Sequence, residues 1–174
     1  MAKSLEFVVH GPFDIPTEAA RSERKLQTDE FWSDGELAML RDRCGCYVFA
    51  LRKVKGEMIP HYVGLTKRRF DNEVFNRSNL VKYQRAMNEV ARGRPVLFLI
   101  VPPHGKGKVS KKYIGPLEHF LIQAGSARNP DVRNVKGVPR PKWLIRGVTG
   151  TRAGKASVPA RRFRETMGIT SRAG

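Results

Sequence analysis

The sequence is poor in cysteine, in long apolar runs and, toward its end, in acidic residues. Two cysteines, Cys44 and Cys46, are present among 174 residues, and one glycine separates them. In an extended strand their Cα atoms would lie about 7 Å apart, which is too far for an unstrained disulfide. Without further clustered cysteines or histidines, two thiols also make no zinc site. We therefore expect two reduced thiols in the core of a cytoplasmic protein.

The sequence also lacks any stretch of 18 consecutive apolar residues, so we expect no membrane span and no membrane partner. Its first residues, MAKSLEFVVHGPFDIP, lack the long apolar segment of a signal peptide. With 40% hydrophobic residues the composition is that of a folded chain, and the length is sufficient for a core. These features predict one domain, or one domain with arms, in the cytoplasm.

Acidic residues become scarce along the chain, and the net charge is +17. Residues 1–42 carry five Lys and Arg against nine Asp and Glu, whereas residues 43–132 carry 17 against six. Residues 133–174 carry 11 basic residues against Glu165 alone. Such a surplus attracts polyanions, through counterion release when the partner is nucleic acid. The charge therefore predicts nucleic acid as the partner.

The order of apolar and polar residues predicts three strands and several helices. The run CGCYVFAL is apolar on both faces, as a central strand is, and a polar turn containing Gly56 follows it. Helical spacing with a following glycine predicts the helices. The expected strands cover 44–51, 59–65 and 95–101, and the expected helices cover 36–40, 80–90, 115–123 and 159–167, with a short one near 18–25.

These elements predict an α/β fold with a small three-stranded sheet, antiparallel or mixed, flanked by helices. Residues 1–42 are expected to form an irregular N-terminal arm, because prolines, acidic residues and isolated aromatics are mixed there. Residues 43–137 then form the core. Residues 138–174 are a basic C-terminal extension that packs on this core.

Glu118 is the most informative candidate for chemistry. It shares one helical face with Ile114, Leu121 and Ile122, where a carboxylate is costly unless it meets a cation, a metal or strong donors. A salt bridge or a partly exposed edge position would explain it without function. A metal site would explain it as well, because one carboxylate, substrate phosphate oxygens and waters suit Mg²⁺.

Tyr47 and Tyr62 lie in the two expected strands of the hairpin. Strand tyrosines are most often packing groups, but two hydroxyls that reach one cavity could orient or deprotonate a water. Gly64 would let a phosphate approach the backbone closely. The basic run that follows offers either solvated charges or donors to a phosphate, and it consists of Lys67, Arg68 and Arg69.

The ordered motifs resemble the GIY-YIG nuclease family, in a divergent bacterial branch. Gly45-Cys46-Tyr47 stands fifteen residues ahead of Tyr62-Val63-Gly64. A basic segment, a helix with an internal glutamate and an asparagine follow in the order of the family, here as Arg68/Arg69, Glu118 and Asn134. The resemblance covers residues 43–137.

This resemblance implies a phosphodiesterase that uses Mg²⁺ or Mn²⁺ and cleaves nucleic acid. By resemblance, the two tyrosines lie beside the scissile phosphate and one helps to activate the attacking water. The implied catalytic set is Tyr47, Tyr62, Arg69 or Arg68 for the phosphate charge, Glu118 as the metal ligand, and Asn134 as support. The residues expected to bind the substrate are Gly64, Thr66, Lys67 and Lys82.

The sequence departs from the family in several places. Asn72 and Asn76 stand where the family has its arginine and a frequent histidine, so Arg69, Arg68 or Arg77 must replace that arginine. Two more positions carry alternatives. Asn129 is a rival of Asn134, and Glu73 is expected to be a solvated helix residue rather than a second carboxylate of the site.

Two classes of function follow for the whole chain. The first is a metal-dependent endonuclease, with DNA expected ahead of RNA as its substrate. The second is a nucleic-acid-binding protein that keeps the fold without cleavage, since the arginine and histidine positions are altered. A basic adaptor protein, in which the tyrosines and the glutamate are purely structural, is the remaining alternative.

Overall fold

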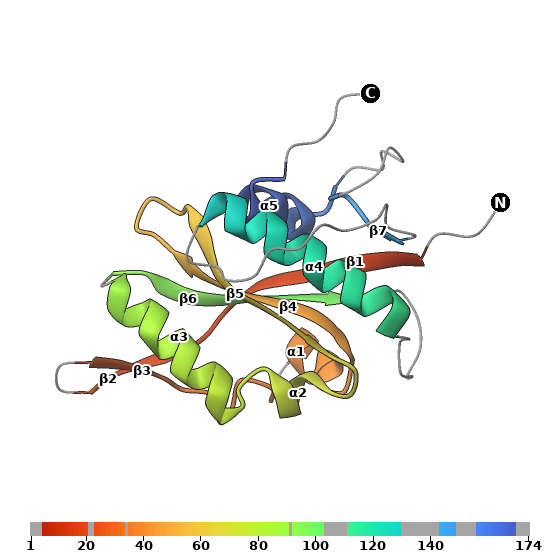
Figure 1. Cartoon of the computed structure of the whole chain (residues 1–174). Helices are drawn as coiled ribbons and strands as arrows, with labels where there is room; N and C mark the ends of the chain where they lie inside the picture. Colours follow the sequence, from red (N-terminus) through yellow and green to blue (C-terminus); the bar gives the residue numbers. More distant parts are fainter. Residues whose placement is uncertain are drawn as a thin grey trace.

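The computed structural model describes residues 5–20, 23–33, 35–90, 92–102, 111–129, 143–148 and 156–169. A twisted central sheet carries helices on both faces (Figure 1). The strand order is β5-β4-β6-β1-β7, with antiparallel pairs except for the parallel pair of β1 and β7. The strands are β1 (Leu5–Asp14), β4 (Gly45–Arg52), β5 (Met58–Thr66), β6 (Arg94–Val101) and β7 (Trp143–Ile145).

The β4–β5 hairpin and the strand β6 form as the sequence predicts. In the hairpin Tyr47 pairs with Gly64 and Phe49 pairs with Tyr62. Every residue of β4 except Arg52 is buried, because its two faces support two separate apolar layers. The α/β class, the hairpin and the buried position of β4 are therefore confirmed.

One face of the sheet packs on α4 (Lys111–Arg128) and α5 (Val158–Met167), above the sheet in Figure 1. The other face packs on α1 (Gly35–Leu40), α2 (Phe70–Glu73) and α3 (Arg77–Glu89), below the sheet. Successive residues of a strand point to opposite faces. Cys46, Val48 and Ala50 therefore face α4 and α5, whereas Tyr47, Phe49 and Leu51 face α3.

The predicted sheet of three strands is wrong, because the sheet has five. The irregular arm is also wrong for the described part of residues 1–42. Strand β1 pairs with β6, and its Phe7 and Val9 enter the core. Where a short helix is expected, β2 (Thr17–Ala20) and β3 (Glu23–Leu26) form a separate two-stranded hairpin. The polar side chains of β3 alternate between exposed and half-buried positions, so no apolar period marks this strand.

Helices α1, α3, α4 and α5 form near their predicted positions, but α3 begins earlier, at Arg77, α4 begins earlier, at Lys111, and α2 is not predicted. Helix α4 continues past Gly125 to Arg128, so that glycine is an interior residue and not a stop. Helix α5 begins at the cap Ser157, which accepts a hydrogen bond from the N–H of Ala160, and ends at Gly168 in the left-handed conformation. Both cysteines are buried and neither is in a disulfide, as expected. Within the described ranges no helix is both long and apolar enough to span a bilayer.

Candidate functional site

The two glycines of the paired motif are each required by a close contact, Gly64 with the Tyr47 ring and Gly45 with the backbone of Ile100. A Cβ atom at Gly64 would lie 2.3 Å from Cζ of Tyr47, so the tyrosine ring covers this glycine. A Cβ atom at Gly45, which has a φ of 152°, would lie 2.1 Å from the carbonyl oxygen of Ile100. The absence of a side chain at residue 64 thus admits the Tyr47 ring. The approach of a phosphate to Gly64 stays a prediction.

Tyr47 is fully buried, and its hydroxyl belongs to a network with α3. Asn79, which is 2% exposed, donates from Nδ2 to the Tyr47 hydroxyl at 2.8 Å and to the carbonyl oxygen of Glu73 at 2.8 Å. Burial raises the pKa of Tyr47, and the neighbouring Tyr62 and Glu73 raise it further, while the hydrogen bond from Asn79 opposes this effect. Tyr47 therefore stays protonated in the unliganded protein at neutral pH.

Tyr62 and Lys82 complete this cluster at the edge of the sheet. The Tyr62 ring is half-buried, and its centroid lies 6.1 Å from that of Tyr47. Nζ of Lys82 lies 3.2 Å from the Tyr62 hydroxyl and 4.4 Å from the ring centroid. Three residues nominated from the sequence, Tyr47, Tyr62 and Lys82, thus meet on one face of the hairpin. A cation beside a phenol is suited to holding an anionic ligand there.

The sequence analysis missed Asn79 and assigned Glu73 to solvent. Glu73 is half-buried, accepts a hydrogen bond from Asn76 at 3.3 Å and contributes to the raised pKa of Tyr47. Asn76 caps α3 by accepting from the N–H of Asn79. The signal for Asn79 was its place three residues after that cap, one position before Leu80 on the apolar side of the helix. A polar side chain there needs a buried partner.

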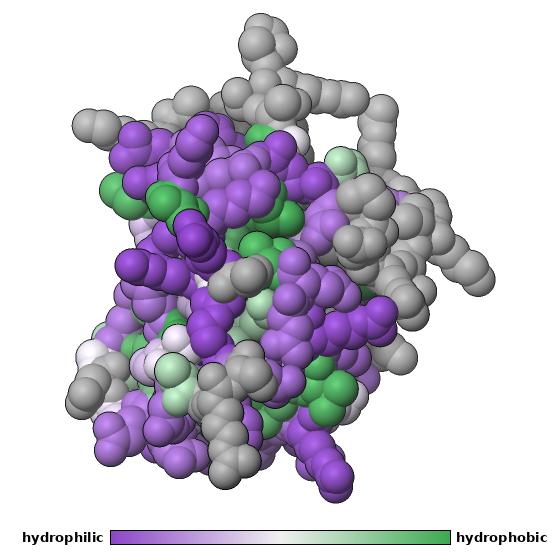
Figure 2. All heavy atoms as spheres, turned by 90° about the vertical axis from the view of Figure 1, so that its left-hand side faces the viewer, coloured by the Kyte–Doolittle hydropathy of each residue, from purple (hydrophilic) through white to green (hydrophobic). Residues whose placement is uncertain are grey.

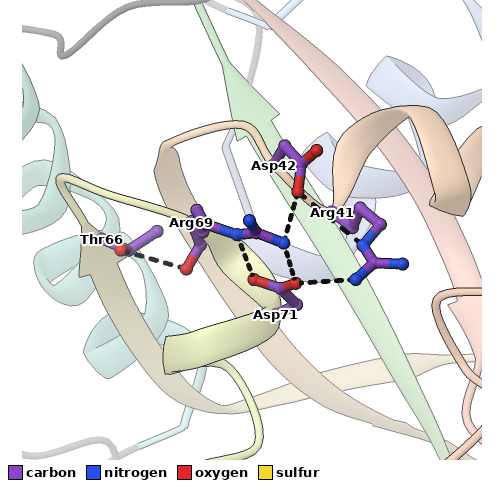
Figure 3. A network of polar contacts seen from close by, with 5 residues as sticks. All are labelled: Arg41, Asp42, Thr66, Arg69 and Asp71. Atoms are coloured by element: carbon purple, nitrogen blue, oxygen red, sulfur yellow. Dashed lines mark hydrogen bonds and ion pairs between the residues drawn. The ribbon is translucent and has the colours of Figure 1, made fainter.

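Arg69 is held in a network of carboxylates and is not available as a free cation (Figure 3). Its guanidinium donates two hydrogen bonds to Asp71 and also pairs with Asp42. Arg41 approaches the same Asp71 oxygen at 3.4 Å. The hydrogen bonds from Arg69 lower the pKa of Asp71 and raise that of Arg69. This network ties the segment before β4 to the turn after β5.

The residues next to Arg69 divide into a structural hydroxyl and two exposed cations. The Thr66 hydroxyl accepts from the N–H of Arg68 at 3.2 Å and donates to the carbonyl oxygen of Arg69 at 3.4 Å, so it stabilises the turn (Figure 3). Lys67 and Arg68 are exposed, and neither takes part in the ion pairs found among the described residues. Of the basic run, these two side chains can reach a phosphate without breaking an ion pair.

Glu118 lies on α4, on the opposite face of the sheet from the tyrosines. Burial raises the pKa of its carboxyl, and His119 opposes this shift. The buried thiol of Cys46 also has a raised pKa, to which Glu118 contributes after burial itself. No interaction between described residues joins Glu118 directly to Tyr47 or Tyr62. The carboxylate is therefore near Cys46, the sheet neighbour of Tyr47, but in the other layer.

The direction of α4 determines which part of the edge strand β5 lies beside Glu118. The Cys46 thiol lies 3.7 Å from the carbonyl oxygen of Ile114, and Cys46 pairs with Leu65 of β5. At the other end of the helix Asn129 donates to the carbonyl oxygen of Pro60 at 2.8 Å, so α4 runs antiparallel to β5. Glu118, one turn after Ile114, therefore lies near the end of β5 that Gly64 and Thr66 form.

Neither asparagine candidate can be assigned a place beside Glu118. Asn134 lies outside the described residues. Asn129 is buried and contacts Pro60 and His61, and it lies eleven positions after Glu118, or roughly 16 Å along the helix axis. Asn129 therefore anchors the far end of α4 to β5.

The described side chains suit only a metal ion that takes few ligands from the protein. Among the described residues no group of three His, Cys, Asp or Glu side chains gathers in one place. Glu118 offers a half-buried carboxylate outside the described ion pairs, whereas the half-buried carboxylate of Glu73 already accepts a hydrogen bond from Asn76. Mg²⁺ accepts such a site, because it keeps several waters and shares substrate phosphates with one or two carboxylates.

Comparisons of the chain with models of known families, with curated proteins and with solved structures find no match. The function must therefore be argued from the residues themselves. The face that carries α3 and the β4–β5 turn is mainly hydrophilic (Figure 2). Large exposed apolar side chains in the described segments are scattered over separate elements, as Met39, Val54, Val81 and Val158.

Proposed function

We propose that the protein is a metal-dependent endonuclease that hydrolyses phosphodiester bonds of nucleic acid, with DNA expected ahead of RNA. The observation that supports this most strongly is that Tyr47 and Glu118 lie near the same end of edge strand β5, on opposite faces of the sheet. The exposed Lys67 and Arg68 follow that strand end directly. The resemblance to the GIY-YIG family supports the proposal, because the glycine of its second motif, Gly64, leaves the space that the Tyr47 ring fills.

In the proposed reaction the nucleic-acid backbone lies along the outer edge of β5. Lys67 and Arg68 donate to phosphate oxygens on one side of the scissile bond, and Lys82 places its charge beside Tyr62. Tyr62 is the half-exposed member of the tyrosine pair and orients the attacking water, while the buried Tyr47 supports it. These residues hold the substrate and the water in place.

Hydrolysis then replaces one P–O bond with another. The water oxygen attacks phosphorus and releases its proton to solvent, and the leaving oxygen takes a proton from solvent as its bond to phosphorus breaks. Glu118 is the residue that would hold Mg²⁺ or Mn²⁺. Such an ion, when bound, supplies positive charge to the phosphate and makes bound water more acidic.

The test is cleavage by the full chain of supercoiled plasmid, single-stranded DNA and a structured RNA, with Mg²⁺, with Mn²⁺ and with a chelator. We expect metal-dependent cutting that Glu118→Gln reduces by about 10²-fold or more. Glu165→Gln is the matched control, because Glu165 lies exposed on α5 and makes one long contact, of 3.9 Å, with Arg162. Equal cutting by the wild type and Glu118→Gln would contradict the metal assignment.

One observation favours the second candidate, a nucleic-acid-binding protein without cleavage. Arg69 is paired with two aspartates and does not supply the free arginine that the family uses. This candidate predicts binding that weakens steeply with salt and no cutting of any of the three substrates with either metal. The same plasmid and RNA assays therefore decide between the two candidates.

A further inference from the structure

A surface hollow lies at the end of the β4–β5 hairpin that is remote from Thr66. It has a volume of about 400 Å³ and lies between the hairpin turn, residues 53–57, and the end of α3 near Val90. The charged residues of its described lining are three cations and one carboxylate, namely Lys53, Lys55, Arg92 and Glu57. The turn lies at the left of Figure 1, so it faces the viewer in Figure 2, where hydrophilic side chains predominate. The lining therefore carries a surplus of positive charge.

Two of these cations are available to an anionic ligand. Glu57 is engaged by Nζ of Lys53 at 3.2 Å and by the guanidinium of Arg128 on α4, so its charge is compensated within the protein. Lys55 and Arg92 are exposed and take part in none of the ion pairs between described residues. An ammonium group and a guanidinium group both donate well to phosphate oxygens.

The end of α3 beside this hollow is covered by a cation from β3. The last carbonyl oxygens of a helix carry partial negative charge and would repel an anion. Here the guanidinium of Arg24 donates to the carbonyl oxygens of Gly93 at 2.6 Å, Val90 at 3.2 Å and Met87 at 3.4 Å. Nε2 of Gln84 donates in turn to the carbonyl oxygen of Arg24 at 2.8 Å, which ties β3 to the helix. The helix end is thus compensated, and the hollow stays attractive to an anion.

The hollow and the cations after β5 lie along the same edge of the molecule. Helix α3 begins shortly after the end of β5 and runs back along this strand. Its Lys82 meets Tyr62 within β5, and its end at Val90 meets the hairpin turn. The exposed Lys67 and Arg68 follow the other end of β5. Lys82 therefore lies between these two cations and the hollow.

The spacing of the two groups of cations fits a nucleic-acid duplex. The nine residues of β5 separate them by roughly 30 Å. One turn of a B-form duplex advances by about 34 Å, after which the same strand faces the same side again. The remaining difference is small beside the reach of the long basic side chains. A duplex that lies along β5 would therefore present backbone phosphates to both groups.

We propose that Lys55 and Arg92 form a second phosphate-binding site, which holds the backbone of the bound nucleic acid about one helical turn away from Lys67 and Arg68. The ligand is a phosphodiester backbone that spans both sites, and Lys82 lies along its path. The identity of this ligand as a substrate rests on the proposed function, whereas its binding in the hollow requires no cleavage.

The first experiment measures the salt dependence of binding in the presence of a chelator. The labelled DNA duplexes have about 8 and about 20 base pairs, or less than one and nearly two helical turns, so the longer one alone reaches both sites. Two additional phosphate contacts steepen the slope of log K against log salt by about 1.8, and we expect this difference between the duplexes for the wild type. In Lys55→Ala/Arg92→Ala we expect the difference to vanish. An equal difference in the wild type and the variant overturns the second site.

The matched control removes the same charge from another part of the surface. Arg161 and Arg162 are exposed on α5, on the opposite face of the sheet from α3. We expect Arg161→Ala/Arg162→Ala to keep the difference between the two duplexes. Loss of the difference in this control as well would show that total charge, and not the hollow, determines the slope, and would overturn the proposal.

The second experiment locates the contact by acetylation of lysines, read by mass spectrometry, again with a chelator. We expect the longer duplex to slow the acetylation of Lys55 several-fold and inorganic phosphate to leave it unchanged. An unprotected Lys55 overturns the proposal. Equal protection by inorganic phosphate would assign the hollow to a free anion and overturn the backbone contact. Neither experiment depends on cutting, so failure of the second site and failure of the proposed function are distinguishable.

Discussion

The two faces of β4 differ in how fully their buried and half-buried polar side chains are paired. On the face of Tyr47 the buried polar side chains have partners, as Asn79 has in Tyr47 and Tyr83 has in the carbonyl oxygen of Val74. On the face of Cys46 the buried Asn129 and Thr166 also bond to carbonyl oxygens, whereas the half-buried Glu118 stands outside the described ion pairs. A half-buried carboxylate that has no ion pair or hydrogen bond with the described residues is kept at a cost in stability. That contrast singles out Glu118 for a ligand.

The largest expected effect comes from the close packing of the tyrosine face. Gly64→Ala places a Cβ atom 2.3 Å from Cζ of Tyr47, so the ring must move and its hydrogen bond from Asn79 breaks. Overpacking and a lost buried hydrogen bond together lower the free energy of unfolding by about 3 kcal/mol. Urea unfolding at neutral pH measures this change.

The control for that experiment lies on the other face. A Cβ atom at Gly115 of α4 meets nothing within 4 Å, so Gly115→Ala is expected to raise stability by up to about 1 kcal/mol. If Gly64→Ala proved as stable as the wild type, the tight packing of Tyr47 on β5 would be refuted. The contrast between the two faces would then lose its basis.

The next prediction compares two neighbouring arginines, one paired with carboxylates and one exposed. Arg69 is engaged by Asp71 and Asp42, whereas Arg68 is exposed and outside the described ion pairs. Arg69→Ala is therefore expected to lower Tm by a few degrees, because it leaves Asp71 and Asp42 without their main cation. Arg68→Ala is expected to leave Tm unchanged.

Binding of nucleic acid should instead be affected by Arg68→Ala and not by Arg69→Ala. A lost phosphate contact reduces the slope of log K against log salt by about 0.9, and we expect this change for Arg68→Ala. Titration of a labelled DNA duplex at several salt concentrations, together with thermal unfolding, measures both properties. A reduced slope in Arg69→Ala alone would assign the phosphate contact to Arg69 and contradict the assignment to Arg68.

The part of the fold that could be predicted from sequence is the part set by local patterns. The apolar alternation of residues 44–51 and the glycine turn predict the hairpin, and with it the shared face of Tyr47 and Tyr62. Strand β1 was missed because a register shift between His10 and Phe13 interrupts its alternation and Pro12 lies within it. Its burial depends on β6 and β7, which are remote in sequence.

The site shows the same division between local and long-range causes. Thr66 and the basic run are adjacent in sequence, so their proximity was predictable, but the pairing of Arg69 with Asp42 depends on a turn before β4. The role of Asn79 depends on Tyr47, which lies 32 residues earlier. Neither pairing leaves a local pattern in the sequence.

The smallest expected effect concerns the free energy of unfolding, which the half-buried carboxylate of Glu118 lowers. Its pKa is raised by burial, so between its usual value near 4.5 and the raised value the folded chain binds more protons than the unfolded chain. Stability due to this group therefore falls as the pH rises through that window. Glu118→Gln removes the cost. The variant should match the wild type at about pH 4 and exceed it at neutral pH by less than about 1 kcal/mol, because the side chain is partly exposed to solvent.

Urea unfolding of both proteins across this pH range measures the difference, and all other carboxylates cancel in the comparison. Added Mg²⁺ then separates a merely uncompensated carboxylate from a ligand. A metal that binds the folded state stabilises it in proportion to the logarithm of its occupancy, so Mg²⁺ should raise the stability of the wild type at neutral pH and not that of Glu118→Gln. Equal stabilisation of both proteins would assign the ion to another part of the chain, and the carboxylate would then be a cost without a ligand.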